Sequence, residues 1–366
     1  MSQTVQIPQP AVSETPLAAA LAENGDAPER AMHRGAKTPL RFAGKPMELQ
    51  GLLHEAGVFD LGYRTMARVT GKDRARWLNG MVTQAVKFMT PGQTAYTLVL
   101  NAQGRIQGDA DVTCDEDALF LETDRSQAER LLTHLRRFII MDDVKLEESE
   151  GLQTAVGIAG PKAAEILGKL GAGAPDAGHF ARAKLAGMDV RVAHGYSPVV
   201  PRFEIHAAAD QILDVWDALA AGGATPCGLE AMEQLRVLEG VPLYDVDFSD
   251  KHLPQETNLE RALNFTKGCY LGQEIVERIR SRATVHRSLR QFELRGDVPK
   301  LTAGEKMELR ADGAAVGELT STAEIALPGS TKKLALGMAR VEALEKNEAL
   351  EYDGGTAVPL SAPPQL

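Results

Sequence analysis

The spacing of apolar and polar residues along the chain predicts two α/β units followed by an all-β unit. Helical spacing of apolar residues occurs at 72–86 and 126–140, and strand-like runs lie before, between and after these segments. The order strand, helix, two strands, helix, strand is that of a split βαβ, ferredoxin-like unit, which we place at 46–150. A similar order follows in 151–285, where we predict a second ferredoxin-like unit. The predicted fold class is therefore α+β.

The two predicted units share a weak internal repeat. When the glycines at 71 and 160 are aligned, apolar helix positions coincide, namely Ala75 with Ala164, Trp77 with Ile166, and Leu78 with Leu167. The match is compatible with duplicated halves, and equally with any two strand–glycine–helix junctions.

The two ends of the chain differ from this pattern. After residue 285, short strands alternate with turn signals such as Asp312-Gly313 and Asp353-Gly354, which predicts a small antiparallel β-barrel or sandwich at 286–366. Residues 1–45 are rich in Ala, Pro, Glu and Gln and lack periodicity. We predict a mostly disordered tail there, with at most one short helix near LAAALAE.

Composition and charge narrow the classes of function. The 366 residues include 40 Lys and Arg against 50 Asp and Glu, a net charge of -10. This balance disfavours direct nucleic-acid binding, and no apolar run is long enough to span a bilayer. The three cysteines, at 114, 227 and 269, include no CxxC pair, which argues against a disulfide framework and against a self-contained metal site. We therefore predict a cytoplasmic protein with no membrane partner and no bound metal.

One cysteine lies in a setting that favours reactivity. In KGCYLGQE, at 267–274, Lys267 stands two residues before Cys269, and a helix is predicted to begin after it. A cation and a helix N-terminus both stabilise a thiolate, so Cys269 is a candidate catalytic thiol, with Lys267 beside it. The alternative is that Cys269 is buried and acts as a small apolar residue.

A longer segment around this thiol resembles a known family. Residues 241–279, VPLYDVDFSDKHLPQETNLERALNFTKGCYLGQEIVERI, resemble the signature of the YgfZ family of folate-binding proteins. WLNGMVTQAV, LNAQGRIQGD, VGIAGPKAAEIL and ADGAAVGELTS resemble further segments of that family, so the likeness covers about 55–345. The family includes iron–sulfur cluster assembly factors and is related in fold to the glycine cleavage T protein, an aminomethyltransferase. The resemblance implies a GcvT-like fold, in which two ferredoxin-like units form a folate cleft beside a C-terminal β-barrel.

The resemblance also implies a function. It suggests a tetrahydrofolate-binding accessory factor in the assembly or repair of iron–sulfur proteins, in which Cys269 acts as a transient thiol, a shared cluster ligand or a redox group. One cysteine cannot supply the four thiolates that a cluster needs, so iron–sulfur carrier or client proteins are the implied partners.

Candidate folate contacts follow from the same resemblance. Glu256 matches an acidic residue of the related transferases, and a carboxylate can accept the paired N–H donors of a pterin edge. Tyr244, Phe265 and Tyr270 could supply apolar walls. Further cofactor-binding candidates are Asn258, Gly268, Gly272, Gln273 and Arg278. In an extended strand Arg278, Arg280 and Arg282 would share one face, where they could receive the anionic folate tail or simply face solvent.

The predicted hairpin near residue 101 departs from the transferase pattern. The transferases carry an aspartate seven residues after the hairpin asparagine, whereas counting from Asn101 gives Gly108 here. Asp109 lies one residue later; a register shift could place it in this role, but in a regular strand its side chain would turn to the opposite face. The alternative function, a folate-dependent aminomethyltransferase of the glycine cleavage T protein type, requires this carboxylate and has no need of Cys269, so the sequence disfavours it. A second alternative is a non-catalytic module that acts on tRNA-modifying enzymes.

Overall fold

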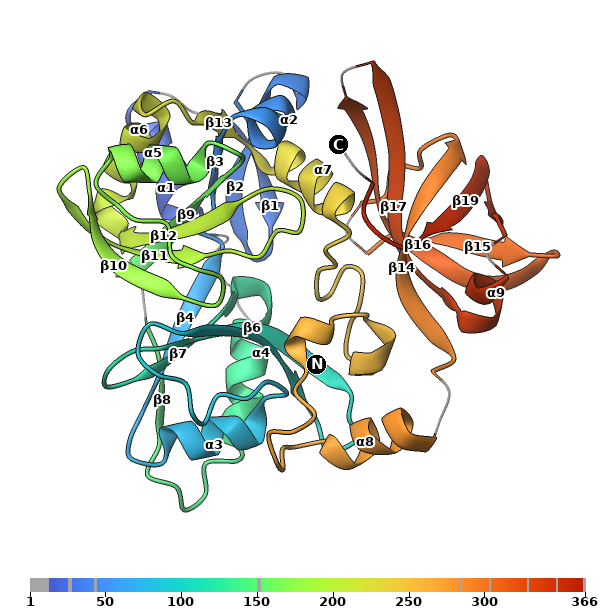
Figure 1. Cartoon of the computed structure of the whole chain (residues 1–366), viewed down its shortest axis with the longest axis horizontal. Coiled ribbons are helices and arrows are strands. Elements are labelled where there is room, and N and C mark those ends of the chain that lie inside the picture. The colour runs from blue at the N-terminus through green and yellow to red at the C-terminus, as the bar shows by residue number, and fades with distance from the viewer. Residues whose placement is uncertain are drawn as a thin grey trace, which may run out of the picture.

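The computed structural model describes residues 13–25, 28–42, 45–149, 153–282, 285–302, 304–327, 329–346 and 348–364. They form two α/β units and a closed β-barrel; in Figure 1 one α/β unit lies above the other, with the barrel at their right. The prediction of two α/β units and a C-terminal barrel is confirmed.

The first unit is a five-stranded antiparallel sheet with two helices. Its strand order is β5-β6-β7-β4-β8. Its elements are β4 (Arg64–Thr70), α3 (Arg74–Met81), β5 (Thr94–Leu100), β6 (Ile106–Cys114), β7 (Leu119–Asp124), α4 (Arg125–Arg136) and β8 (Lys145–Glu148). Apolar residues of α3 and α4, among them Trp77 and Leu131, pack against one face of the sheet. The other face carries polar side chains.

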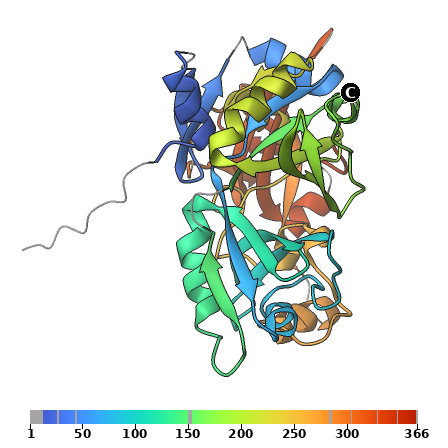
Figure 2. The same ribbon diagram turned by 90° about the vertical axis from the view of Figure 1, so that its left-hand side faces the viewer.

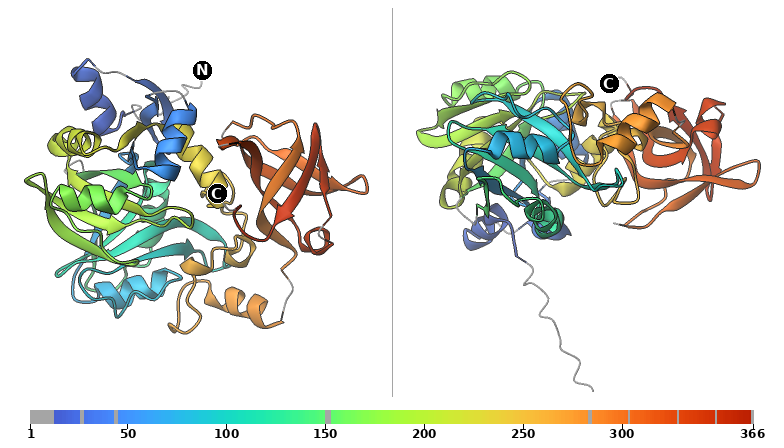
Figure 3. Two further views of the ribbon diagram at one scale, coloured as in Figure 1. Left: turned by 45° about the horizontal axis from the view of Figure 1, so that its top comes forward. Right: turned by 90° about the horizontal axis from the view of Figure 1, so that it is seen from below.

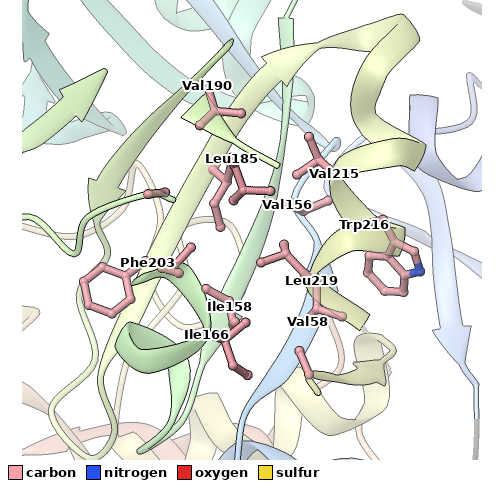
Figure 4. Packing of buried hydrophobic residues seen from close by; sticks show 14 of the residues in the cluster. Val58, Val156, Ile158, Ile166, Leu185, Val190, Phe203, Val215, Trp216 and Leu219 are labelled. Atoms are coloured by element: carbon pink, nitrogen blue, oxygen red, sulfur yellow. The ribbon is translucent and has the colours of Figure 1, made fainter. Parts of the chain in front are cut away.

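The second unit repeats this chain order. Its elements are β9 (Gln153–Ala159), α5 (Ala163–Lys169), β10 (Phe180–Leu185), β11 (Met188–His194), β12 (Arg202–Ala208), η1 (Ala209–Gln211), α6 (Ile212–Ala221) and β13 (Thr225–Cys227). The strand order β10-β11-β12-β9 matches β5-β6-β7-β4 of the first unit, which confirms the duplicated halves. Figure 4 shows the core between this sheet and its helices, with Trp216 of α6 facing Val58 and Leu219.

The two aligned glycines serve the same purpose in both units. Gly71 has φ +100° and Gly160 has φ +126°, a region that favours glycine. A Cβ on Gly71 would lie 2.0 Å from the carbonyl oxygen of Asp143, and a Cβ on Gly160 would lie 2.6 Å from that of Glu55. Each glycine therefore permits a close backbone contact where a strand gives way to a helix.

The predicted boundary between the units needs correction. Strand β3 (Gly57–Asp60), expected in the first unit, pairs with β9 and β13 in the second sheet. Figure 2 shows the chain then passing from the second unit into β4 of the first. The exchange ties the units together, because the second sheet takes β3 from before the first unit and its other strands from after it.

The N-terminal region is folded where the structure describes it, which corrects the predicted disordered tail; residues 1–12 lie outside the described residues. It contains α1 (Pro16–Glu23), the hairpin β1 (Glu29–His33) and β2 (Ala36–Arg41), and α2 (Lys45–His54). The buried carboxylate of Asp60 accepts hydrogen bonds from the hydroxyl groups of Thr15 and Thr38. These bonds hold the N-terminal region against the second unit, and the left view of Figure 3 shows α1 beside that unit.

Helix α7 (Leu229–Glu239) joins the second unit to the barrel. Its apolar residues contact β16 and β17, and its Arg236 bonds Asp247 at 2.7 Å and Ser321 at 2.8 Å. The barrel contains β14 (Arg287–Gly296), β15 (Met307–Ala311), β16 (Ala314–Leu327), β17 (Ser330–Arg340), α9 (Val341–Glu345), β18 (Leu350–Tyr352) and β19 (Gly355–Leu360). Strand β19 pairs with β14, which closes the barrel.

A long segment after α7 crosses from the second unit to the first. It contains η2 (Pro254–Glu256), η3 (Glu260–Ala262) and α8 (Gln273–Arg282). Tyr244 and Phe248 of this segment pack on Leu98 and Leu100 of β5. The right view of Figure 3 shows α8 between the first unit and the barrel. The predicted second unit therefore ends near α7. Arg278, Arg280 and Arg282 lie on the helix α8, so the shared face that an extended strand would give them does not form.

Candidate functional site

The polar faces of the two sheets meet at a cavity of about 200 Å³. Strands β4 to β7 line it from the first unit, and β12 with the loop before it lines it from the second. The turn between β1 and β2, the helix α7 and the short helix η3 complete the wall. The cavity is therefore built by segments from most of the chain, as in many ligand sites between domains.

A buried charge network occupies one side of the cavity. Arg64 of β4 bonds Glu204 of β12 and Asp111 of β6, each at 2.6 Å, and lies 3.3 Å from Glu122 of β7. Glu122 also contacts the ring of His206 at 2.9 Å. The network therefore links strands of both sheets through one guanidinium.

This network holds two of its carboxylates, Glu122 and Glu204, in the charged form despite their burial, whereas burial raises the pKa of the third, Asp111. Burial alone would raise the pKa of Glu122, but Arg64 and His206 hold it well below its ordinary value. For Glu204 burial is again the largest influence, and Arg64 and Arg202 together lower its pKa. Each carboxylate can accept more than the bonds it makes here, so the network presents acceptors to a ligand.

A further carboxylate, Asp109, faces the cavity from β6. It accepts hydrogen bonds from the hydroxyl group of Tyr96 at 2.7 Å and from the amide of Gln127 at 2.6 Å. These two bonds fix its position from both sides. No carboxylate was expected here, because the position counted from Asn101 is Gly108.

A β-bulge explains the difference. Val99 pairs with Gly108 and Leu100 pairs with Ile106, so Gln107 has no partner of its own in the hairpin. One extra residue reverses the alternation of faces, which turns Gly108 toward α4 and Asp109 toward the cavity. A Cβ on Gly108 would lie 2.6 Å from the side-chain oxygen of Gln127. The expectation that the hairpin lacks a cavity-facing carboxylate is therefore wrong.

The β1–β2 hairpin supplies a second buried arginine, which the sequence interpretation missed. Arg34 pairs with Asp124 at the end of β7 and donates to the carbonyl oxygen of Tyr244 at 2.6 Å. Arg34 and Gly35 form the hairpin turn, both with positive φ. Burial lowers the pKa of the neighbouring His33 to about 4, so this ring is neutral in the cavity wall. The one available sequence signal was the Arg-Gly pair between two short strand-like runs.

Arg261 of η3 projects into the cavity near its opening. Its guanidinium lies 3.8 Å from the ring centre of Tyr96 and 3.9 Å from that of Tyr196. Tyr196, in the loop between β11 and β12, is 49% exposed. We call these three residues the Arg261 stack; it joins a side chain from each α/β unit across the opening.

The predicted pterin contact Glu256 lies outside the cavity lining. Its carboxylate accepts the backbone N–H of Leu253 at 2.7 Å and bonds Arg287 at 2.6 Å. It therefore caps η2 and ties it to the barrel, whereas Glu204, Asp111 and Asp109 are among the carboxylates that line the cavity.

The predicted aromatic walls are also elsewhere. Tyr244 and Tyr270 are buried in the core behind β5. Phe265 is 39% exposed and stacks against Arg280. Asn258 adopts a left-handed turn with φ +59°, and Arg278 is exposed on α8. The structure brings none of these residues into the cavity lining.

The signature loop forms a separate surface feature. Cys269 is exposed, and its loop rests on the tip of the β5–β6 hairpin. A Cβ on Gly272 would lie 2.5 Å from the carbonyl oxygen of Asn101, so only glycine permits this contact. Gly268 has φ +91° and open space around it, and the side-chain oxygen of Gln273 accepts the backbone N–H of Tyr270.

Lys267 points away from the thiol and into the first unit. Its ammonium group donates to the carbonyl oxygens of Asn79, Val82 and Gln84 at 2.5–2.7 Å. Burial lowers its pKa to about 7, while the three acceptors at the end of α3 favour its charged form. Lys267 therefore anchors the loop and does not pair with Cys269.

Two further observations concern the described residues only. None of their helices is long and apolar enough to cross a membrane. No group of three or more His, Cys, Asp or Glu among them is arranged to hold a metal ion.

Comparisons with known proteins agree over most of the chain. The GCVT N-terminal domain family model matches residues 30–267. An aminomethyltransferase of Deinococcus deserti is 26% identical over 304 residues, which cover 82% of this chain and 84% of that protein. An aminomethyltransferase of Synechocystis sp. is 27% identical over 347 residues, 87% of each chain. The crystal structure of the glycine cleavage system aminomethyltransferase T from Bartonella henselae shares the fold with a TM-score of 0.82 at 17% identity, covering 96% of this chain and 97% of that one.

Proposed function

Because the chain belongs to the GCVT N-terminal domain family, we propose that it binds tetrahydrofolate in the central cavity and acts as a folate-dependent aminomethyltransferase. The names of its relatives and its GcvT-like fold support this choice over the iron–sulfur accessory role. The narrower resemblance to the YgfZ family belongs to the second candidate function below. The observation that carries the proposal is the position of Asp109 in the cavity wall.

The residues of the cavity fit the chemistry of a folate. A pterin edge presents adjacent N–H donors, and Glu204, Asp111 and Glu122 offer acceptors on one side of the cavity. Phe59 and Tyr63 of the same wall can cover an aromatic ring. Buried charged acceptors beside apolar walls are typical of sites that bind polar heterocycles.

Asp109 is placed to handle a proton. A folate amine that attacks the carbon of an aminomethyl donor forms a carbon–nitrogen bond while the bond from that carbon to the donor's leaving group breaks, and the new ammonium nitrogen must then lose its proton. The carboxylate of Asp109, fixed by Tyr96 and Gln127, can orient this amine and accept the proton. This is the role for which the sequence seemed to lack a residue.

The proposal is tested by turnover. The purified protein is mixed with tetrahydrofolate and an aminomethyl donor, and one-carbon transfer to folate is measured. We expect activity in the parent protein and a loss of about 10²–10⁴-fold in Asp109→Asn, the range for general acid–base catalysis. Asp189→Asn is the control, because Asp189 is exposed on β11 and contacts only Lys184. Failure of the parent protein to bind tetrahydrofolate would overturn the proposal.

A second candidate function rests on a different observation. Cys269 is exposed outside the cavity on a loop held by Gly272 and Lys267. An accessible thiol on a fixed loop suits the assembly or repair of iron–sulfur proteins together with a carrier or client protein. Its test is a [4Fe–4S] enzyme activity in cells that lack their own family member, supplied with the parent, Cys269→Ser or Asp109→Asn. Rescue that fails only with the serine variant would favour this function, and rescue that fails only with Asp109→Asn would favour transfer.

A further inference from the structure

One arginine of the cavity differs from the others in its partners. The guanidinium groups of Arg34, Arg64, Arg202 and Arg236 each pair with a carboxylate. Among the described residues, the side chain of Arg261 has no hydrogen bond or ion pair, and its Nε atom is buried without an acceptor. A desolvated donor without an acceptor is costly, so such groups in folded proteins usually serve a ligand or a water.

The Arg261 stack leaves the hydrogen-bonding edge of this guanidinium group uncovered. Tyr96 and Tyr196 lie over the guanidinium face and do not take its hydrogen-bond donors. The donors lie in the plane of the group, where a fork of N–H groups matches a carboxylate in two parallel bonds. The two rings hold this plane fixed near the opening, since they come from different α/β units.

We propose that Arg261 is an anion-binding subsite at the opening of the cavity, and that it binds a carboxylate of the glutamate tail of tetrahydrofolate. This inference rests on the proposed function and names which part of the ligand lies at the opening. Tyr96 connects the two ends of the site, because its ring covers Arg261 while its hydroxyl group bonds Asp109. A ligand whose amine lies at Asp109 therefore has its tail on the side of the Arg261 stack.

The charge balance of the cavity supports a carboxylate at this place. Asp111, Glu122 and Glu204 all share the charge of Arg64, so an anion placed beside this arginine would be repelled by the three carboxylates. At Arg261 the same anion meets a cation that forms no ion pair among the described residues and acts on Asp111 only through its longer-range field. The cavity thus offers acceptors for a donor-rich heterocycle at one end and a cation for its acidic tail at the other.

The test compares two ligands by isothermal titration calorimetry. 5-Formyltetrahydrofolate carries the benzoyl-glutamate tail, and 6-methyltetrahydropterin lacks it. We expect Arg261→Gln to weaken binding of the first ligand by ~10–100-fold, the range for a hydrogen-bonded charge pair. Binding of the second should change by less than about 2-fold, since it makes no contact with Arg261. Arg261→Lys should fall between the parent and Arg261→Gln, because an ammonium group keeps the charge but loses the fork.

A control variant and a change in salt concentration test whether the loss of affinity is specific to Arg261. Arg182→Gln removes an exposed arginine of β10 that pairs with Asp115, and it should leave both affinities unchanged. Raising the salt concentration should weaken binding of the tailed ligand to the parent protein more than to Arg261→Gln. If Arg261→Gln does not fold, the tail-selective loss in Arg261→Lys decides the question.

Two different failures are distinguishable. If the parent binds both ligands and Arg261→Gln weakens both equally or neither, the anion subsite is wrong and Arg261 only supports the fold. If the parent binds neither ligand, the proposed function itself is wrong, and the inference falls with it.

Discussion

Glu239 offers a quantitative test of the buried charges around the cavity. It lies at the end of α7, is 4% exposed, and accepts a hydrogen bond from Ser197 in the loop that carries Tyr196. Burial raises its pKa from 4.5 to about 7, and the bond from Ser197 opposes this only in part. Replacement of Glu239 by Gln keeps the acceptor for Ser197 and removes the charge.

The sign and size of the change in the free energy of unfolding with pH follow from the pKa of Glu239 in the unfolded chain and in the folded protein. Between pH 4.5 and 7 the unfolded chain has lost this proton while the folded protein retains it, so the free energy of unfolding falls as the pH rises through this window. At about 1.4 kcal/mol per pH unit, the gap amounts to about 3 kcal/mol. Glu239→Gln avoids this loss. We therefore expect the free energy of unfolding of the variant, minus that of the parent, to be about 3 kcal/mol larger at pH 8 than at pH 4.

The assay is urea unfolding at pH values from 4 to 8.5, followed by tryptophan fluorescence. Trp216 lies in the core of the second unit and reports on the domain that holds Glu239. Glu165→Gln is the control, since Glu165 is an exposed residue of α5 that contacts Lys169. A parent–variant difference that does not change between pH 4 and 8, or that grows in favour of the parent, would refute the argument for a raised pKa.

Two further changes test the fold around the site. Arg64→Met should lower the free energy of unfolding by about 3–5 kcal/mol, because it removes the cation that Glu204, Asp111 and Glu122 share, and Arg202 and His206 compensate only part of the remaining charge; urea unfolding at pH 7 measures this, and a loss below about 1 kcal/mol would contradict the pairing. Gly71→Ala should cost more stability than Gly187→Ala by about 2 kcal/mol or more. Both glycines have positive φ, but only at Gly71 does a Cβ meet a backbone oxygen, so equal losses would contradict the close contact.

The parts of the fold that the sequence predicted are those with local signals. The apolar stripe of α3, the strand–glycine–helix junctions at 71 and 160, and the turns of the barrel all depend on neighbouring residues. Strand β3 and the β1–β2 hairpin depend instead on partners far along the chain. Four residues of β3 carry no sign that they pair with β9 rather than with the first sheet, and a short hairpin in a polar N-terminal region resembles a disordered tail.

The candidate site was harder to predict for a related reason. Strand β6 alternates polar and apolar residues, which in a single sequence describes equally a face toward solvent and a face toward a cavity. Its Asp109 and Asp111 became site residues only when the second sheet covered them. The bulge at Gln107 added a shift of one residue that no count from Asn101 could include. Conversely, the KGCYLGQE segment carries a clear resemblance to a known family in the sequence, yet it lies outside the cavity.

The cavity and the loop that carries Cys269 are separate, but residues of both bond the same residue, Gln84. The backbone carbonyl of Gln84 accepts a hydrogen bond from Lys267, and its side chain donates to the carbonyl oxygen of Arg261. A change at Lys267 or Gln84 therefore disturbs both regions and cannot assign a function to either. Asp109 and Cys269 have no such shared contact, since one is held by Tyr96 and Gln127 and the other is exposed. Variants at these two residues are for this reason the ones that can separate folate-dependent transfer from thiol chemistry in this protein.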